Sequence, residues 1–213
     1  MKILIFFIAA AGGYLIGGVN PAIIISRAVY RVDVRRFGSH NPGFTNFMRI
    51  FGNEHAYTVF IIDFLKSALA AALFGWAFLR LWDSWQLGAA YTAIFTLLGH
   101  AYPVWYNFQG GKGVSVLIAS FCIVDWRSAV VMLVIFLIII AVTRYMSLSV
   151  MIASVFGPIT LAVAGTEHPA VLPIMAACVL FLIWRHRENI GRLRSGTESK
   201  FSLKSSKGKR KEE

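Results

Sequence analysis

The sequence predicts an all-α polytopic membrane protein. Of its 213 residues, 57% are hydrophobic and only 15% are charged, whereas a soluble domain carries about 25% charged residues. The apolar residues also fall in long runs, and a membrane-spanning helix needs roughly 20 of them in succession. Inside hydrocarbon every backbone N–H and C=O group must be paired within its own segment, so runs this apolar are expected to be helices.

Seven hydrophobic segments can be drawn along the chain. The fourth is too short to span a bilayer comfortably. The residues alone therefore indicate five to seven crossings. The segments cover residues 3–26, 55–80, 86–106, 112–125, 128–144, 147–165 and 168–184.

The first segment has the features of a membrane anchor rather than a cleaved signal peptide. Its apolar run exceeds the about 7–15 residues of a signal peptide's hydrophobic region, and four arginines follow it between residues 27 and 36. We expect Asn20 and Pro21 to break or kink this helix near its inner end.

The second segment carries two ionisable residues within its apolar run. Asp63 and Lys66 are three residues apart, so they lie on one face of a helix and are expected to pair. Such a pair inside a membrane is either a functional site or a structural brace.

The distribution of Lys and Arg predicts the orientation. With seven crossings and an external N-terminus, 17 of the 21 Lys and Arg residues fall on the cytoplasmic side. The external side holds only Lys2, Arg80 and Arg127. The C-terminus is therefore expected in the cytoplasm. Residues 1–194 would form the helical membrane domain, and the basic residues 195–213 a disordered cytoplasmic tail that can lie against anionic headgroups.

Three polar segments fall on this cytoplasmic side, and the first runs from Gly38 to Arg49. Its Gly, Asn and Pro residues predict turns that free backbone N–H groups to point inward, an arrangement suited to an anion. Thr45 or Asn46 is expected to cap a following helix, whose N-terminus would favour phosphate. An ordinary capped loop is the alternative interpretation.

The second polar segment places three glycines around a lysine. Gly110, Gly111 and Gly113 flank Lys112, which is the composition of a phosphate-binding loop. It is not a Walker A motif, because no Ser or Thr follows the lysine, and nucleotide hydrolysis is unsupported. A glycine-rich turn between two helices is the alternative.

The third polar segment runs from Arg185 to Glu198. On a helix leaving the membrane, Arg185, Asn189 and Arg192 would share a face, as would His186 and Asn189. A positively charged stop after the last crossing explains the arginines, but it explains His186 and Asn189 poorly.

Together these segments resemble the bacterial glycerol-3-phosphate acyltransferases that use acyl phosphate, the PlsY family. The family's first motif, Gly-Ser-x-Asn-x-Gly-x-Thr-Asn-x-x-Arg, is met by residues 38–49. Its second, Gly-Gly-Lys-Gly-Val, is met by residues 110–114. Its third, Arg-His-x-x-Asn-Ile-x-Arg-Leu-x-x-Gly-x-Glu, is met by residues 185–198. Small departures are His40, Phe44, Ser115 and Val116.

The resemblance implies acyl transfer from acyl phosphate to the 1-hydroxyl of sn-glycerol 3-phosphate, giving lysophosphatidic acid and phosphate, the first step of phospholipid synthesis. It also implies a seven-helix protein of the bacterial inner membrane with its active site on the cytoplasmic face. Acyl phosphate, glycerol 3-phosphate and membrane lipid are the expected partners. No cofactor, metal, acyl-CoA, acyl-carrier protein or nucleic acid is expected.

The resemblance also implies roles for individual residues. The expected catalytic residues are Ser39, Arg49, Lys112, His186 and Asn189. The acyl-phosphate head would be bound by Ser39, Asn41, Gly43, Thr45 and Asn46. Glycerol 3-phosphate would be bound by Arg49, Gly110, Gly111, Lys112, Gly113, His186 and Asn189. Glu198 is expected to have a structural role. The sequence offers no protein base, and by hypothesis the acceptor's own phosphate takes the proton.

Two other functions are compatible with parts of the sequence. A membrane transporter of a phosphorylated solute would also use glycine-broken helices and cations, but the polar segments gather on one side and no inverted repeat is visible. A structural membrane protein with a lipid-binding basic face would leave the polar uncharged residues unexplained.

Overall fold

The structure is a computed structural model that describes residues 2–201. Over this range the chain is helical and contains no strand. The α-helices are α1 (Leu4–Gly18), α2 (Pro21–Tyr30), α3 (Phe44–Phe51), α4 (Ala56–Trp82), α5 (Trp85–Ala101), α6 (Val114–Val124), α7 (Trp126–Thr143), α8 (Met146–Ala164), α9 (Val171–Arg185) and α10 (Arg187–Arg194), and the short 3-10 helices are η1 (Val34–Arg36) and η2 (Val104–Tyr106).

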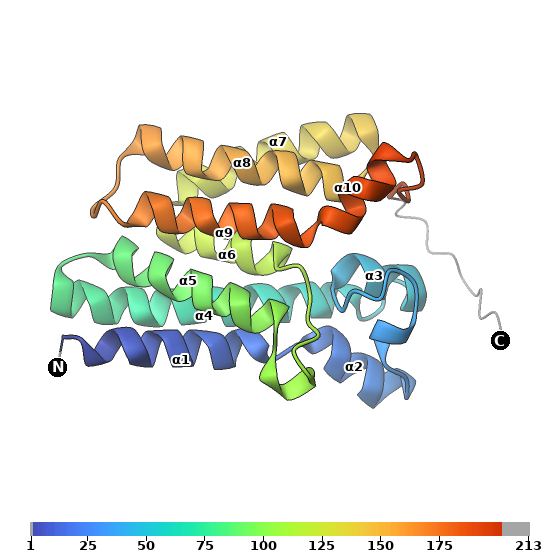
Figure 1. The fold of residues 1–213 in the computed structure, drawn as a ribbon, viewed down its shortest axis with the longest axis horizontal. Helices are drawn as coiled ribbons and strands as arrows, with labels where there is room; N and C mark the ends of the chain where they lie inside the picture. Colours follow the sequence, from blue (N-terminus) through green and yellow to red (C-terminus); the bar gives the residue numbers. More distant parts are fainter. Residues whose placement is uncertain (1, 202–213) are drawn as a thin grey trace.

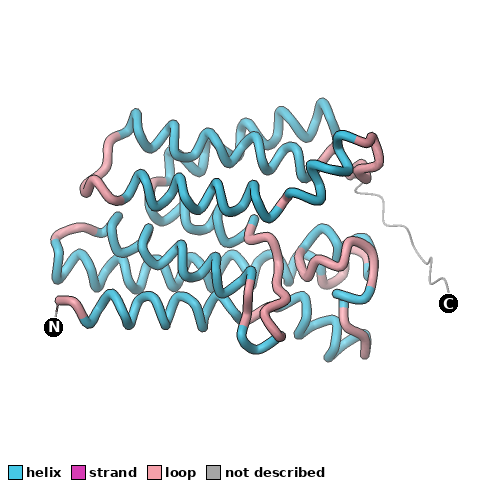
Figure 2. Tube along the Cα trace, viewed as in Figure 1, coloured by secondary structure: helices cyan, strands magenta, loops and turns pink. Residues whose placement is uncertain are grey.

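The long helices run side by side between two ends of the molecule (Figure 1). One end holds the start of α1 and the connections that follow α4, α6 and α8. The opposite end holds α2, α3, α10 and most of the loop residues (Figure 2). We call the second one the loop-rich end. All three polar segments lie there, so the expectation that they share one side of the protein is confirmed.

The predicted hydrophobic segments correspond closely to helices. Within the described residues, four stretches are long and apolar enough to cross a membrane: Leu4–Tyr30, Ala56–Trp82, Trp126–Thr143 and Met146–Ala164. The first of these stretches includes both α1 and α2. The fourth segment forms only the 11-residue α6. At about 1.5 Å per residue this helix spans about half of a hydrocarbon core. The count of seven crossings stays a prediction.

The break in the first segment is confirmed. Helix α1 ends at Gly18 and α2 begins at Pro21, whose fixed backbone suits the first position of a helix. Between them, the side chain of Asn20 accepts a hydrogen bond from the backbone N–H of Ile23 at 3.0 Å and caps α2. The Asn20 side chain thus pairs one of the free N–H groups at the start of α2 where the helix is broken.

Buried apolar residues form two clusters. The larger fills the space between α1, α4, α5, α6, α8 and α9. The smaller lies at the loop-rich end and joins α2, η1 and α3 to the start of α4. Helix α7 lies at the edge, and its outward side chains are exposed, as expected for a surface that faces lipid: Val130, Val134, Ile138 and Val142.

The predicted tail has an ordered beginning. Residues 195–201 lie against the helices, where Glu198 accepts a hydrogen bond from Ser147 at 2.6 Å and the backbone N–H of Phe201 donates to the carbonyl of Arg144 at 2.7 Å. The expectation of disorder from residue 195 onward is therefore wrong for Glu198 and Phe201, which find partners on α8 and at Arg144, the residue after α7. The rest of the predicted tail, 202–213, lies outside the described residues.

Candidate active site

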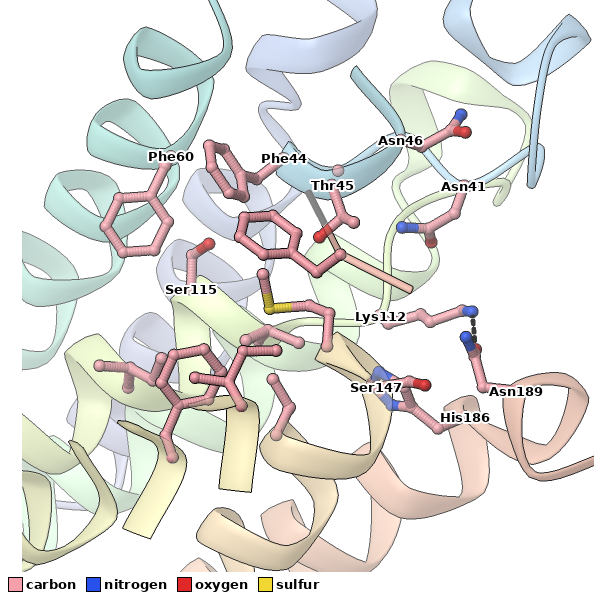
Figure 3. Close-up of a pocket in the computed structure, with 18 of the residues that line it drawn as sticks. Asn41, Phe44, Thr45, Asn46, Phe60, Lys112, Ser115, Ser147, His186 and Asn189 are labelled. Atoms are coloured by element: carbon pink, nitrogen blue, oxygen red, sulfur yellow. Dashed lines mark hydrogen bonds between the residues drawn. The ribbon is translucent and has the colours of Figure 1, made fainter. Parts of the chain in front are cut away.

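A cavity of about 780 Å³ opens at the loop-rich end, and residues of all three polar segments line it. Of the predicted site residues, the structure brings together all but two around this cavity: Ser39, Asn41, Gly43, Thr45, Asn46, Arg49, Lys112, Gly113, His186, Asn189 and Glu198. Figure 3 shows Lys112 extending toward Asn189, with Asn41 and Thr45 on the opposite wall. The remaining two, Gly110 and Gly111, do not line it, and Gly110 borders a second, smaller pocket.

The side chain of Asn46 fixes the shape of the first polar segment through hydrogen bonds. Its side-chain oxygen accepts a hydrogen bond from the backbone N–H of Ser39 at 2.9 Å, and its amide donates to the carbonyl of Phe37 at 3.1 Å. Gly38 has a φ of +62° and approaches the same side-chain oxygen so closely that a Cβ would not fit. Asn46 therefore sets the loop's shape, and its own role in binding acyl phosphate stays a prediction.

The expected cap of the following helix is wrong. Helix α3 begins at Phe44 after Gly43, so both Thr45 and Asn46 lie inside its first turn, and no side chain caps it. Its first N–H groups lack intrahelical partners. They lie beside the cavity with Gly43 and Thr45, where a negative charge would be stabilised by the helix dipole.

The glycine loop is held from both sides. The backbone N–H of Gly110 donates to the carbonyl of Ala101 at 3.1 Å, and that of Gly111 donates to the carbonyl of His100 at 3.0 Å. From the other side, the Arg185 guanidinium donates to the carbonyls of Gly110 and Gly111 at 3.3 and 3.0 Å. Arg185 thus reaches the back of the loop and borders a separate, smaller pocket.

Lys112 is the cation at the centre of the polar wall. Its ammonium group donates to the side-chain oxygen of Asn189. Burial lowers the pKa of Lys112 to about 8, and the nearby charge of Arg192 acts in the same direction. Most molecules therefore carry a protonated Lys112 at pH 7, available to an anion in the cavity.

His186 lies at the junction of α9 and α10 and is 4% exposed. Its Nδ1 lies 2.8 Å from the carbonyl oxygen of Leu182, which only accepts, so Nδ1 carries the proton. Burial lowers the pKa of His186 to about 4. The ring is therefore neutral at pH 7, and its Nε2 is a hydrogen-bond acceptor.

Glu198 connects the third segment to α8. It accepts hydrogen bonds from Ser147 and Asn189, and its second oxygen pairs with Arg192 at 2.7 Å. Burial would raise the pKa of Glu198, but these three donors hold it below its ordinary value. Ser147 had no signal in the sequence, since it lies in an apolar segment 51 residues before its partner.

The same cavity continues as an apolar groove along α6, α7 and α8. Its α7 wall extends over the twelve residues from Ile140 to Ala129, and the eleven steps between them span about 16 Å at the rise of an α-helix. This is about half the thickness of a bilayer's hydrocarbon core, or one leaflet. The groove is lined mainly by Leu117, Ile118, Met132, Leu133, Phe136, Leu137, Met146, Val150 and Ala153.

Proteins of one family are similar to nearly the whole chain. The family model described as glycerol-3-phosphate acyltransferase matches residues 7–196. The glycerol-3-phosphate acyltransferase of Burkholderia pseudomallei (strain 1710b) is 38% identical, over 98% of this chain and 100% of that protein. One from Rhizobium etli (strain ATCC 51251) is 37% identical, over 92% and 91%.

Two solved structures are similar along nearly the whole chain. Both are crystal structures of PlsY (YgiH), described as an integral membrane glycerol 3-phosphate acyltransferase. The glycerol 3-phosphate form has a TM-score of 0.83 and 33% identity, covering 92% of this chain and 96% of that one. The lysophosphatidic acid form has a TM-score of 0.80 and 32% identity, covering 93% and 96%.

Proposed function

Because the chain belongs to the glycerol-3-phosphate acyltransferase family, PlsY, we propose that it transfers an acyl group from acyl phosphate to the 1-hydroxyl of sn-glycerol 3-phosphate. The hydroxyl oxygen forms a bond to the acyl carbonyl carbon. The bond from that carbon to the phosphate oxygen breaks, and the hydroxyl loses its proton. The products are lysophosphatidic acid and inorganic phosphate.

The observation that carries this proposal is the shape of the cavity, a polar end that continues into an apolar groove. Acyl phosphate has the same division, with a charged head and a hydrocarbon chain. The head would lie against the first loop and the start of α3, and the chain would lie along α6, α7 and α8. The groove would hold the acyl chain of a thioester donor equally well, so the choice of acyl phosphate rests on the three motifs that resemble the PlsY family.

Electrostatic stabilisation and positioning account for the chemistry. Both substrates carry phosphate, and Arg49 and Lys112 line the polar end, where charge-assisted hydrogen bonds are strong. Phosphate is already a good leaving group, so no covalent intermediate on the protein is needed. Ser39 and Asn41 complete the polar wall around the donor head, and Asn189 orients Lys112.

The proton is best taken by the acceptor's own phosphate. His186 faces the cavity as a neutral ring with Nε2 free to accept, so it suits the glycerol hydroxyl better than the phosphate. With a pKa of about 4 it is the weaker base, because a phosphate monoester has a second pKa of about 6. His186 would therefore orient the hydroxyl, and the substrate's phosphate would receive its proton.

The charge distribution supports an active site on the cytoplasmic face of the bacterial inner membrane. Most of the described arginines belong to segments at the loop-rich end, whereas Arg80 and Arg127 lie near the ends of helices at the other. The proposed topology has seven crossings, made by α1 and α4–α9, with the N-terminus outside.

Transport of a phosphorylated solute is the alternative function. It would require polar groups along a path through the membrane, but the polar lining of this cavity is gathered at one end and the remainder is apolar. The acyltransferase is therefore the better supported function.

The test is the transfer of labelled glycerol 3-phosphate into lipid by the purified protein, with palmitoyl phosphate or palmitoyl-CoA as the donor. We expect labelled lysophosphatidic acid with palmitoyl phosphate alone, and its loss in Lys112→Ala. Product from palmitoyl-CoA alone would contradict the proposed donor. No lipid product from folded protein with either donor would contradict the reaction, and flux of glycerol 3-phosphate in proteoliposomes would then support transport.

A further inference from the structure

Three ionisable side chains lie buried beside the glycine loop, and the proposed chemistry does not use them, although Asp63 and His100 border the cavity. The Asp63 carboxylate lies 2.7 Å from the Lys66 ammonium, which confirms the predicted pair. The same oxygen of Asp63 lies 3.3 Å from Nδ1 of His100, on the last turn of α5. Asp63 and His100 are 2% and 3% exposed. We call these three residues the buried charge cluster.

Lys66 binds the end of α1. Its ammonium donates to the carbonyls of Gly17, at 2.9 Å, and of Val19. Carbonyls at the end of a helix have no intrahelical partner, and the break at Asn20 leaves these two at the loop-rich end. A buried cation satisfies them and interacts favourably with the helix dipole. The end of α1 is thereby fixed to α4.

His100 carries the contact to the glycine loop. Its carbonyl accepts the backbone N–H of Gly111 at 3.0 Å, and its ring lies against Gly111 so closely that a Cβ there would overlap Nε2. Asp63 and Lys66 both lie within 3.3 Å of the ring's other nitrogen. The position of Gly111 therefore depends on a ring that the ion pair orients.

We propose that Asp63, Lys66 and His100 act as one positioning unit, which holds the glycine loop and through it Lys112 for the phosphate of glycerol 3-phosphate. These three residues act through Gly111 and need not touch substrate. The inference rests on the proposed function. It differs from a simple brace between α1, α4 and α5, because a brace affects stability, whereas a positioning unit also affects the affinity for one particular substrate.

Three variants separate the two roles: Asp63→Asn, Lys66→Met and the double variant. Removing one partner of a buried ion pair leaves an uncompensated charge and destabilises the fold, but removing both is often close to neutral. We therefore expect lower melting temperatures for the single variants and recovery of much of that loss in the double variant. The double variant would still lack the groups that orient His100 and hold the end of α1.

The expected kinetic result is specific to one substrate. A shift of the loop by a fraction of an ångström should lower kcat/KM for glycerol 3-phosphate roughly tenfold to a hundredfold, mainly through KM. The KM for palmitoyl phosphate should stay within about twofold, because its head and chain are bound by other elements. Binding of glycerol 3-phosphate, measured by calorimetry, should weaken in parallel.

Asp125→Asn is the matched control. Asp125 is also buried, but it caps α7 at the other end and accepts hydrogen bonds from Ser128. Its variant should lose stability with an unchanged KM. If the double variant recovers the KM for glycerol 3-phosphate together with its melting temperature, the cluster is only a brace and the proposal is overturned. If the unaltered protein transfers no acyl group, the proposed function fails instead.

Discussion

Lys112 is the residue whose protonation should limit activity at high pH. Its pKa is about 8, lowered by burial, so the ammonium is lost as pH rises through that value. Bound phosphate favours the charged form and raises the pKa of Lys112 in the complex. The free enzyme should therefore be more sensitive to alkaline pH than the complex.

We predict a bell-shaped pH profile of kcat/KM for glycerol 3-phosphate. The acidic limb should lie near pH 6, because the substrate's phosphate has a second pKa of about 6. The alkaline limb should begin near pH 8 and fall about tenfold per pH unit. The measurement is the initial rate at low glycerol 3-phosphate across this pH range. The alkaline limb of the kcat profile should lie at a higher pH than that of kcat/KM.

Lys112→Arg is the control for this assignment, since a guanidinium stays charged throughout. Its activity will be lower overall, because the longer planar group fits the Asn189 contact differently. Its profile should nevertheless lack the alkaline limb. An alkaline limb at the same pH in Lys112→Arg would mean that another group titrates.

At the residue scale, the sequence predicted which polar side chains would meet but not how they would be paired. Residue type and order were enough to bring Lys112 and Asn189 to one cavity. The predicted role of Asn46 as a helix cap was wrong. A polar side chain at the start of a helix can form hydrogen bonds either with that helix or with the preceding loop, and Asn46 bonds to the loop. His100 beside Asp63 depends on how α4 and α5 pack, which short-range spacing does not reveal.

At the scale of elements, α8 forms the inner wall of the apolar groove and should help to set how much acyl chain fits. Ala153 lines the groove and is 4% exposed, whereas Val155, two residues further along the helix, is 42% exposed and faces outward. The two positions lie on different faces of one helix. They therefore offer a matched pair for substitution.

Ala153→Phe should shorten the preferred acyl chain. A phenylalanine side chain would fill the groove below the head, so kcat/KM for palmitoyl phosphate should fall about tenfold to a hundredfold while lauroyl phosphate is affected much less. Rates with a series of acyl phosphates measure this. Val155→Phe should leave kcat/KM unchanged for every acyl phosphate. An equal loss of kcat/KM at every acyl-chain length in Ala153→Phe would mean that the acyl chain does not bind along this part of the groove.

The elements themselves were largely predictable because each has a strong local cause. Long apolar runs predicted the long helices to within a few residues, and Asn20 with Pro21 predicted the break. The start of α3 was harder to predict from the sequence, since Gly43 precedes it and no side chain caps it. The groove was not predictable at all, because the residues that line α7 and α8 have the same composition as those that face lipid.

At the scale of the whole molecule, residues 195–201 join two parts that otherwise border the cavity from opposite sides. Helix α3 packs on η1 and α4, whereas α10 packs on α8 and α9. From α10 the chain continues through Glu198 to Phe201, whose ring packs against the small apolar cluster of α2, η1 and α3. Composition predicted a basic tail here, and only the tertiary contacts of Glu198 and Phe201 distinguish its first residues.

This connection should matter for substrate binding. Residues 198–201 line the cavity, and a partly buried phenylalanine contributes about 1 kcal/mol. A chain that ends at Ser199 loses the Phe201 anchor but keeps Glu198, so we expect KM to rise roughly fivefold for both substrates. Phe201→Ala in the full chain should have a similar effect, measured by the same transfer assay.

A chain that ends at Phe201 is the control, since it removes only residues 202–213 and should keep the KM values of the full chain. An equal rise in KM in both truncated chains would contradict a role for Phe201. It would assign the effect to residues 202–213, which both chains lack and whose basic side chains attract anionic lipid.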